Sequence, residues 1–282
     1  MDVDVHQLRT FVAIAECGSF SGAARELGYT QSAVSQHIAA LEASLGATLL
    51  ERRPVALTVV GARLLEHARP LLLRFDAAKV DIARLNSAPP VTVSIGLSPL
   101  AMTRRTAEAL QQATVHVLTR EDVVAKVAAG KVDLGLIDGL TAPSDPLNLP
   151  DVGPFTAARV SEQPVTVALP KSHPLATRKG LRLSDLADAH WIDAPGTAIP
   201  LTQLRAATGT DAFHPALRYE GTDIHTLTTL IAAGKGLAIL PPIGPELAFV
   251  PVTAPRVVHR VEVLYSSTVD GPAAALARAL AG

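Results

Sequence analysis

Residues 19–46 read SFSGAARELGYTQSAVSQHIAALEASLG, and this stretch decides the fold of the N-terminal part of the chain. Its first ten residues predict a short helix that ends at Gly28, because glycine readily adopts the left-handed conformation that closes a helix. Thr30 is a favourable N-cap for a second helix, whose apolar stripe is Val34, Ile38, Leu41 and Leu45. Two helices joined by so tight a turn have the outline of a helix-turn-helix, which places its second helix in the DNA major groove.

The second helix leaves small polar side chains outside its apolar stripe. Glutamine amides pair with adenine edges, and serine hydroxyls reach bases or phosphates. Each such residue alone is more often a solvated surface residue, but their grouping near the N-terminus of this helix favours base recognition. Thr30 would also direct the positive end of the helix at a phosphate. The expected DNA contacts in this helix are Thr30, Gln31, Ser32, Ser35 and Gln36, with His37 also facing outward.

The flanking segments complete a small domain. Residues 6–16 have apolar side chains at helical spacing, Gly18 ends that helix, and Ser19 or Ser21 caps the next one. Residues 46–58 predict a short two-stranded wing around Pro54. Arg52 and Arg53 are the only adjacent cations in this region, so we expect them at the DNA backbone, with a solvated wing as the alternative.

From Gly61 onward, apolar residues recur at alternating steps of three and four positions. This heptad spacing favours a helix that packs against the same helix of a second chain, and the alternative is a lone amphipathic helix. Pro70 interrupts the pattern, so it either kinks the helix or starts a second one. The seam consists of Gly61, Leu64, Ala68, Leu71, Phe75, Ala78, Ile82 and Leu85, and the dimer contacts are expected at Leu64, Ala68, Leu71, Phe75, Ile82 and Leu85.

The composition limits the class of protein. The 282 residues carry a net charge of −1, and residues 1–60 hold four Arg side chains against six acidic ones, which is unusual for a DNA-binding segment. Affinity would then depend on base contacts and on linking two reading heads in a dimer. The single cysteine, Cys17, fits a reducing cytoplasm and is expected to be buried. No long apolar run or signal peptide is visible, which also predicts a cytoplasmic protein.

Beyond a linker at residues 86–90, strands and helices alternate. Strands are expected at 91–97, 115–118, 132–138, 164–170, 190–194, 216–220, 237–241 and 256–267, with a closing helix at 272–280. This βαβ rhythm predicts an α/β fold with open, mostly parallel sheets, and two small sheets rather than one.

Over its whole length the chain resembles the LysR-type transcriptional regulators. The specific match is QSAVSQHIAALE followed by LG, and weaker matches follow in the family's order: Leu57, Thr58 and Gly61 of an LT-x-x-G motif, then VDLGLID, PVTVALPKSHPLA and AAGKGLAILP. The resemblance implies a winged helix-turn-helix domain at 1–60, a dimerising linker helix at 61–87 and a two-lobed effector domain at 88–282. In that domain, lobe 1 would comprise 91–160 and 254–282, and lobe 2 would comprise 161–253. It further implies a non-enzymatic homodimer or homotetramer, and contact with RNA polymerase if the protein activates transcription.

Ligands of open α/β sheets bind at the carboxyl ends of strands, and the family resemblance places a small-molecule effector between the two lobes. The effector could be an anionic metabolite. Each Ser or Thr hydroxyl at these strand ends could instead cap the helix that follows it. Asp193 could either favour a cationic or hydroxyl-bearing ligand or pair with a nearby arginine. The expected effector contacts are Ser98, Leu100, Thr119, Asp193, Thr197 and Thr222.

Two other classes fit the sequence less well. A periplasmic-type binding protein without a DNA role would explain residues 91–282 but not the first 87. An enzyme would need a motif that is missing: Gly234-x-Gly236 is too short for a dinucleotide fingerprint, and there is no P-loop, nucleophile elbow or zinc-ligand spacing. We therefore expect no catalytic residue, no metal site and no cofactor.

Overall fold

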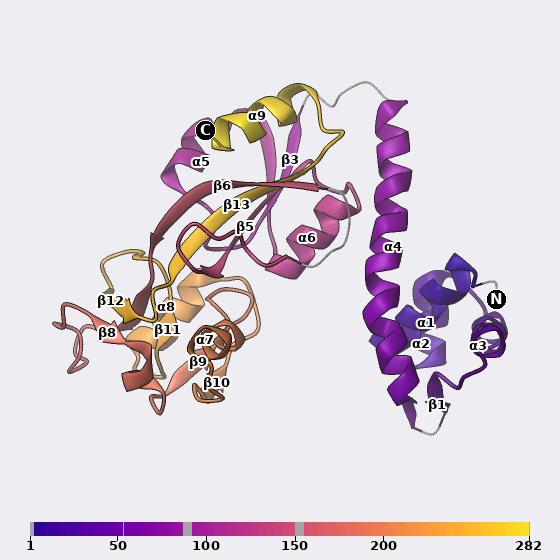
Figure 1. Ribbon diagram of the computed structural model, residues 1–282, viewed down its shortest axis with the longest axis horizontal. Helices are drawn as coiled ribbons and strands as arrows, with labels where there is room; N and C mark the ends of the chain where they lie inside the picture. Colours follow the sequence, from indigo (N-terminus) through magenta and orange to yellow (C-terminus); the bar gives the residue numbers. More distant parts are fainter. Residues whose placement is uncertain (1–2, 53, 87–91, 150–154, 282) are drawn as a thin grey trace. The chain divides into compact units, whose positions relative to one another are not determined.

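The computed structural model describes residues 3–52, 54–86, 92–149 and 155–281. They form two compact units, one made chiefly of residues up to Lys79 and one made chiefly of residues from Val80 onward, which are called here the N-terminal and C-terminal units (Figure 1). Each unit has its own hydrophobic core and is described separately. No helix in the described part of the chain is long and apolar enough to cross a membrane.

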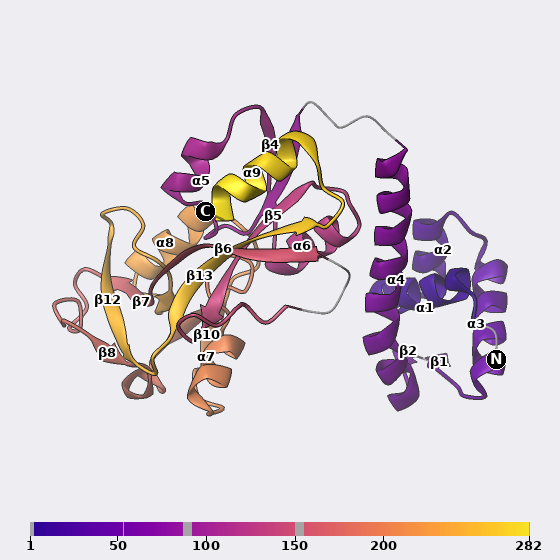
Figure 2. The same cartoon turned by 45° about the horizontal axis from the view of Figure 1, so that its top comes forward.

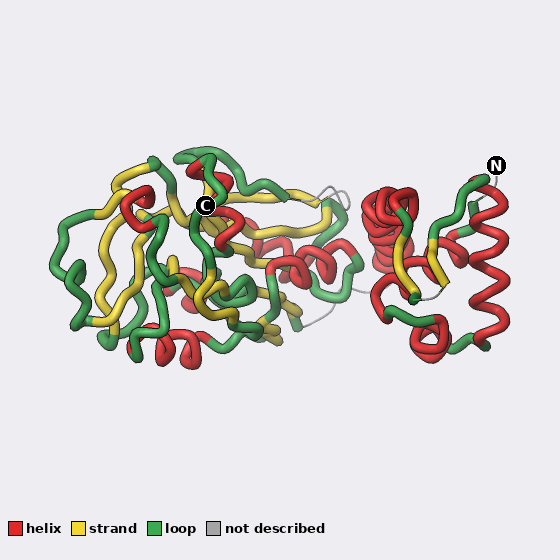
Figure 3. The backbone as a smooth tube through the Cα atoms, turned by 90° about the horizontal axis from the view of Figure 1, so that it is seen from below, coloured by secondary structure: helices red, strands yellow, loops and turns green. Residues whose placement is uncertain are grey.

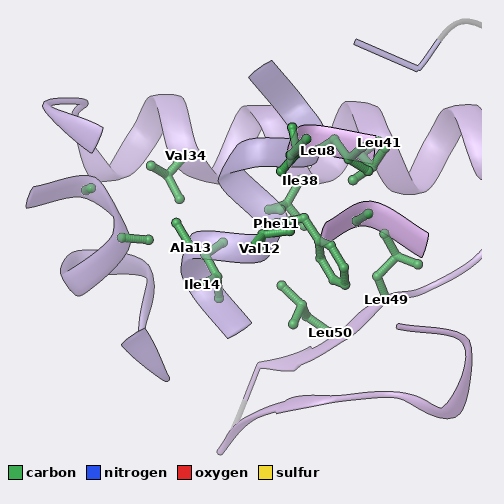
Figure 4. Close-up of a cluster of buried hydrophobic side chains, with 14 residues drawn as sticks. Leu8, Phe11, Val12, Ala13, Ile14, Val34, Ile38, Leu41, Leu49 and Leu50 are labelled. Carbon is green, nitrogen blue, oxygen red and sulfur yellow. The ribbon is translucent and has the colours of Figure 1, made fainter. Parts of the chain in front are cut away.

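Three helices build the N-terminal unit: α1 (Val5–Cys17), α2 (Phe20–Leu27) and α3 (Gln31–Leu45). The predicted caps are present, since Ser19 accepts a hydrogen bond from the Gly22 amide, and Gly18 and Gly28 are left-handed. The stripe of α3 packs against α1 in a core that includes fully buried Phe11 (Figure 4). The helix-turn-helix prediction is confirmed, because the spacing of buried residues and both turns are as the sequence indicated.

The wing is the antiparallel pair β1 (Leu50–Arg52) and β2 (Val55–Leu57). The LT-x-x-G motif closes it: the Thr58 hydroxyl donates to the Thr48 carbonyl and accepts from the Gly61 amide. A Cβ on Gly61 would lie 2.0 Å from the Leu49 carbonyl oxygen, so only glycine allows this approach. Gly61 therefore serves the wing junction rather than a heptad seam.

The helix α4 (Val59–Leu85) continues through Pro70 without a break, so of the two alternatives for this proline the start of a second helix is excluded. Two ion pairs join α4 to α1, Arg9 with Asp76 at 2.7 Å and Arg69 with Glu16 at 3.2 Å. These contacts, together with the apolar packing of Leu72, hold the first five turns of α4 on the three-helix core.

The predicted seam of α4 divides into two parts. Ala68 is fully buried in the core of its own unit and Leu64 packs on that core, so Ala68 is not available to a partner and its assignment to the seam is corrected. By contrast, Leu71, Phe75 and Ile82 are 56%, 43% and 62% exposed, and Ala78 is exposed between them. The side chain of Leu85 lies outside the described residues.

Cys17 was expected to be buried but is exposed at the end of α1. The apolar side of α1 faces the core, and Cys17 lies off that side. The Cys17 thiol donates to the Glu26 carboxylate at 2.9 Å. That hydrogen bond, with a smaller effect from desolvation, raises the pKa of the Cys17 thiol.

The C-terminal unit contains two main sheets (Figure 2). The first, with its helices called lobe 1, has the strand order β4 (Ala113–Val117), β3 (Val93–Leu97), β5 (Leu134–Thr141), β13 (Val258–Ser266) and β6 (Phe155–Pro164). Along the inner strands β3 and β5, the side chains alternate between two covered faces. On one face Ile95 and Leu136 pack under α9 (Gly271–Ala281), beside α5 (Arg104–Ala109), whereas Gly135 on the other face lies against α6 (Arg120–Ala128).

The second part, called lobe 2, holds the sheet β11 (Ala238–Ile239), β7 (Thr166–Pro170), β12 (Leu247–Ala254) and β8 (Leu181–Arg182). A separate parallel pair consists of β9 (Trp191–Asp193) and β10 (Pro215–Arg218). The 3₁₀ helix Leu183–Leu186 and the helices α7 (Leu201–Thr208) and α8 (Ile224–Ala232) complete the lobe. Figure 3 shows the mixture of helices (red) and strands (yellow) in the C-terminal unit. Trp191 and Phe213 meet edge to face in its core.

The expectation of mostly parallel sheets is wrong. Strand β13 pairs antiparallel with both β5 and β6, and β7 pairs antiparallel with β11 and β12. The reason is topological: the chain leaves lobe 1 along β6 and returns along β13, so the two strands run in opposite directions. Strands β6 and β12 were not predicted, because proline and polar residues interrupt their apolar alternation.

Candidate functional site

The exposed face of α3 brings the predicted DNA-contacting residues together. Gln31, Ser32 and Gln36 are exposed and Ser35 is half-buried, whereas Val34 and Ile38 on the opposite face are fully buried. The core thus fixes the rotation of the helix and leaves Gln31, Ser32 and Gln36 outside it. This arrangement suits a helix that enters a groove and offers neutral amides and hydroxyls to base edges.

Thr30 begins α3 as predicted: its hydroxyl accepts a hydrogen bond from the Ala33 amide at 3.2 Å and lies 3.0 Å from the Ser32 hydroxyl. His37 differs from expectation. Its Nδ1 lies 2.9 Å from the hydroxyl of buried Thr10, and its ring meets Tyr29 edge to face. His37 therefore joins α3 to α1 and is not part of the outward polar face.

The basic residues of the N-terminal unit are partly committed to structure. Arg9 is paired with Asp76, as described above, while Arg25 is exposed at the end of α2. Arg52 lies on β1, its side chain is not described, and Arg53 lies outside the described residues. The wing thus places at least the backbone of Arg52 beside the helix-turn-helix.

The predicted effector contacts come together around loops of the C-terminal unit. Thr119 caps α6, with its hydroxyl accepting from the Asp122 amide, and is half-buried. A Cβ on Gly196 would lie 2.6 Å from the Gly221 carbonyl oxygen and 3.7 Å from the Thr119 methyl carbon. The loops at Thr119, at Gly196 and at Gly221 are therefore close neighbours, although they come from both lobes.

The other predicted contacts differ in their availability. Thr197 is fully buried, and its hydroxyl donates to the Gly221 carbonyl at 2.5 Å. Asp193 pairs with Arg218 at 3.3 Å, which realises the arginine alternative. Thr222 is half-buried, and Leu100 is buried in an apolar cluster that includes Ile192 and other lobe 2 residues.

Ser98 is fully buried and belongs to a polar network that the sequence did not reveal. Its hydroxyl donates to one carboxylate oxygen of Asp138 at 2.5 Å and accepts from the Asp138 amide at 3.1 Å. The other oxygen of Asp138 accepts from Arg120 at 2.7 Å and lies 3.0 Å from the Nε2 atom of His259. The side-chain amide nitrogen of Gln163 lies 3.1 Å from the Nδ1 atom of His259. Because an amide nitrogen can only donate, Nδ1 accepts this hydrogen bond and Nε2 carries the proton that is donated to Asp138.

The charge state of Asp138 follows from this network. Burial alone would raise the pKa of the carboxyl group, but the Arg120 charge and the hydrogen bonds from His259 and Ser98 outweigh burial. The pKa of Asp138 therefore lies well below its usual range, and the group is an anion at neutral pH.

A signal for this network was present in the sequence. Asp138 ends the apolar strand VDLGLID, and Arg120 follows the cap Thr119, at strand ends where ligands bind in such folds. What the sequence could not show was that the two charges lie in the same place. Among the described residues, no group of three or more potential ligands is arranged to hold a metal ion.

Two protein-family models together match most of the chain. Residues 5–62 match the model of the bacterial regulatory helix-turn-helix proteins of the lysR family, and residues 90–281 match the LysR substrate binding domain. The HTH-type transcriptional regulator IlvR of Caulobacter vibrioides is 30% identical over 96% of this chain and 89% of its own length. The uncharacterized HTH-type transcriptional regulator YnfL of Escherichia coli is 29% identical over 86% of this chain and 83% of its own.

Solved structures show the same fold. Full-length BenM has a TM-score of 0.50 at 22% identity, covering 98% of this chain and 95% of its own. An OxyR cysteine variant from Corynebacterium glutamicum has a TM-score of 0.50 at 24% identity, covering 99% and 92%.

A helix-turn-helix with an exposed polar reading face, carried on one chain with a two-lobed α/β unit, defines a class: DNA-binding transcriptional regulators with an effector-binding domain. Within that class, the chain belongs to the LysR family.

Proposed function

We propose that α3 reads its DNA site through Gln31 and Gln36, which pair with adenine edges, and through Ser32 and Ser35, which reach bases or phosphates. The N-terminal end of α3 at Thr30 faces a phosphate, and Arg52 and Arg53 contact the backbone from the wing. The observation that carries this proposal is the division of α3 into a buried apolar face and a polar face with Gln31, Ser32 and Gln36 exposed.

We also propose a homodimer formed through the exposed stripe of α4, defined by Leu71, Phe75, Ala78 and Ile82. These residues repeat at steps of four, three and four and leave about half of each large side chain uncovered. Leu64 and Leu85 would flank the stripe. By analogy with the family, two dimers form a tetramer, and each dimer reads an interrupted palindrome whose half-sites lie about one helical turn apart.

The functional domains proposed for this chain keep the sequence-based boundaries, with DNA binding in 1–60, dimerisation in 61–87 and effector binding in 88–282. The effector binds between lobe 1 and lobe 2, for which the sequence suggested about 91–160 with 254–282 and about 161–253, whereas the sheets change over near Pro164 and Val258. The half-buried residues Thr119, Asp193 and Thr222 contact the effector. The buried residues Ser98, Leu100 and Thr197 support the protein loops that surround it.

The same proposal places the protein in the cytoplasm as a regulator without catalytic turnover or cofactor, in contact with RNA polymerase if it activates transcription. The lack of catalytic motifs in the sequence and the regulators among its relatives support this assignment.

Selection of bound genomic fragments tests the DNA reading. The double variant Gln31→Ala with Gln36→Ala should lose its preference for the selected site over random DNA by about fivefold or more for each base contact removed, since a good bidentate pair contributes about 1–3 kcal/mol. The matched control is Gln111→Ala with Gln112→Ala, two exposed glutamines of the C-terminal unit. An unchanged preference in the α3 variant, with its melting temperature intact, contradicts the proposal.

A further inference from the structure

Arg120 is the first residue of α6 in lobe 1, yet its guanidinium group also reaches lobe 2. Its Nε donates to the Asp138 carbonyl at 2.8 Å and one Nη donates to the Asp138 carboxylate at 2.7 Å. The other Nη donates to the carbonyl oxygens of Pro195 and Ala198 at 2.8 and 3.0 Å. A single side chain thus joins strand β5 to the loop at residues 194–200, which leads from β9 to α7.

The pair is removed from solvent, with the side chain of Arg120 10% exposed and that of Asp138 fully buried. In such surroundings the loss of one partner leaves a desolvated charge without compensation. The Asp138 carboxylate also accepts from Ser98 and His259, so its orientation is fixed from three sides. Both groups are therefore suited to hold geometry rather than to adapt to a ligand.

The loop that Arg120 grips is the one on which effector binding is proposed. It carries Thr197, whose hydroxyl donates to the Gly221 carbonyl, and Gly196, which is packed closely against the same carbonyl group. Fixing the carbonyl groups of Pro195 and Ala198 therefore sets the position of both loops relative to Thr119.

We infer that Arg120 and Asp138 are positioning residues that hold the lobe 2 loop 194–200 against lobe 1, and that Asp138 acts as a built-in anion beside Ser98. This inference rests on the proposed effector role of that loop. The Ser98 hydroxyl is fully buried and already donates to Asp138, so it serves this network and is not free to contact an effector.

Other contacts between the lobes limit the effect of losing Arg120 to its own loop. The Gln203 side chain on α7 accepts from the Leu140 amide at 2.9 Å, and Leu100 packs among lobe 2 residues. These contacts do not depend on Arg120. Loss of the Arg120 contacts should loosen residues 194–200 while the two lobes stay associated.

Hydrogen exchange of the full-length protein tests the positioning role without any effector. In the wild type, the amides of Thr197 and Ala198 donate to the Ala194 carbonyl. In Arg120→Gln, these two amides should exchange with solvent about tenfold faster or more. The matched control is Arg218→Gln, which breaks the exposed pair with Asp193 and should leave these amides unchanged. Arg120→Lys should give an intermediate rate. Wild-type exchange at residues 194–200 in Arg120→Gln overturns the inference.

Chemical rescue tests the built-in anion. Asp138→Ala removes the carboxylate but keeps its donors, so sodium formate should raise the melting temperature of this variant above that in equal sodium chloride and should restore slow exchange at 194–200. The wild type should respond equally to both salts. If the variant does not fold, its refolding yield in formate is the readout, and Asp138→Asn supplies the exchange measurement. Equal effects of the two salts on Asp138→Ala overturn the inference.

These results are independent of the proposed DNA reading, which the glutamine variants of α3 test separately. They also do not require that the effector be known. A loosened loop together with an effector that later maps elsewhere would contradict the proposed effector site but not the role of the pair.

Discussion

The exposed stripe of α4 allows a direct test of the proposed homodimer. The double variant Leu71→Asp with Phe75→Asp puts two carboxylates on each chain where the stripe is expected to meet its copy. The two wild-type side chains are 56% and 43% exposed, so about half of each can still be buried. Complete burial of such side chains contributes about 1.5–3 kcal/mol each, which leaves about 1 kcal/mol apiece.

A two-fold interface counts each residue twice, so four side chains together contribute about 4 kcal/mol. Their loss corresponds to a dissociation constant about 10³-fold higher, before the cost of burying carboxylates is added. Sedimentation equilibrium measures this directly. Site-specific DNA binding should weaken in parallel, by about 10²-fold or more, because two linked reading heads depend on the dimer.

Ala62→Asp is the matched control for the stripe. Ala62 is exposed on the same helix, and nine residues at 100° per residue place it on the side opposite Leu71. The control should keep both the dimer and the DNA affinity. A double variant that sediments as the wild type does, or that binds the selected site with full affinity, would refute the assignment of the stripe as the dimer contact.

Three further predictions concern stability and reactivity. Gly61→Ala should lower the free energy of unfolding of the N-terminal unit by about 1–3 kcal/mol or more, measured by denaturant titration, because its Cβ would lie 2.0 Å from the Leu49 carbonyl oxygen; an unchanged midpoint would contradict the described wing junction. The pKa of Asp138 is depressed, so the contribution of its charge to stability is complete above the ordinary carboxyl pKa of about 4 and declines as the pH falls toward the folded pKa. The difference in melting temperature between wild type and Asp138→Asn should therefore be widest near neutral pH and should narrow below about pH 4. A difference independent of pH would disprove this. The pKa of the Cys17 thiol is raised chiefly by its hydrogen bond to Glu26, so Glu26→Gln should speed its alkylation by iodoacetamide at pH 7, and a slower reaction would contradict that cause.

The helix-turn-helix could be read from sequence because every signal there is local. The caps at Ser19 and Thr30 and the left-handed turn at Gly28 depend on a few neighbouring residues. The apolar spacing of α3 then fixed which side faces the core. For the same reason Gln31, Ser32 and Gln36 were placed correctly on the exposed face, whereas His37, which contacts Thr10 of α1, was not.

The seam of α4 shows where a periodic pattern becomes ambiguous. A spacing of three and four residues is satisfied equally by packing on the same chain and by packing on a second one. Ala68 was assigned to the second role but fills the first, because the three-helix core lies along the start of α4. Only the three-dimensional arrangement separates the two.

For the network at Asp138, the sequence could suggest single members but not that they meet. Ser98, Arg120, Asp138 and His259 are separated by up to 161 positions, and no local rule joins them. Sequence reasoning placed Ser98 at the end of a strand, and β3 does end one residue earlier, at Leu97. It could not tell that the hydroxyl is already taken by a carboxylate from a neighbouring strand.

The paired strands β6 and β13 make lobe 2 a single insertion into lobe 1. Pro164, where the chain leaves, and Val258, where it returns, face each other as partners across the same ladder. The intervening segment therefore starts and ends at one place on the edge of the five-stranded scaffold. Its remaining links to lobe 1 are side-chain contacts, such as those of Arg120 and Gln203, so a change in these few side chains alters how the recognition lobe is attached while the chain path stays the same.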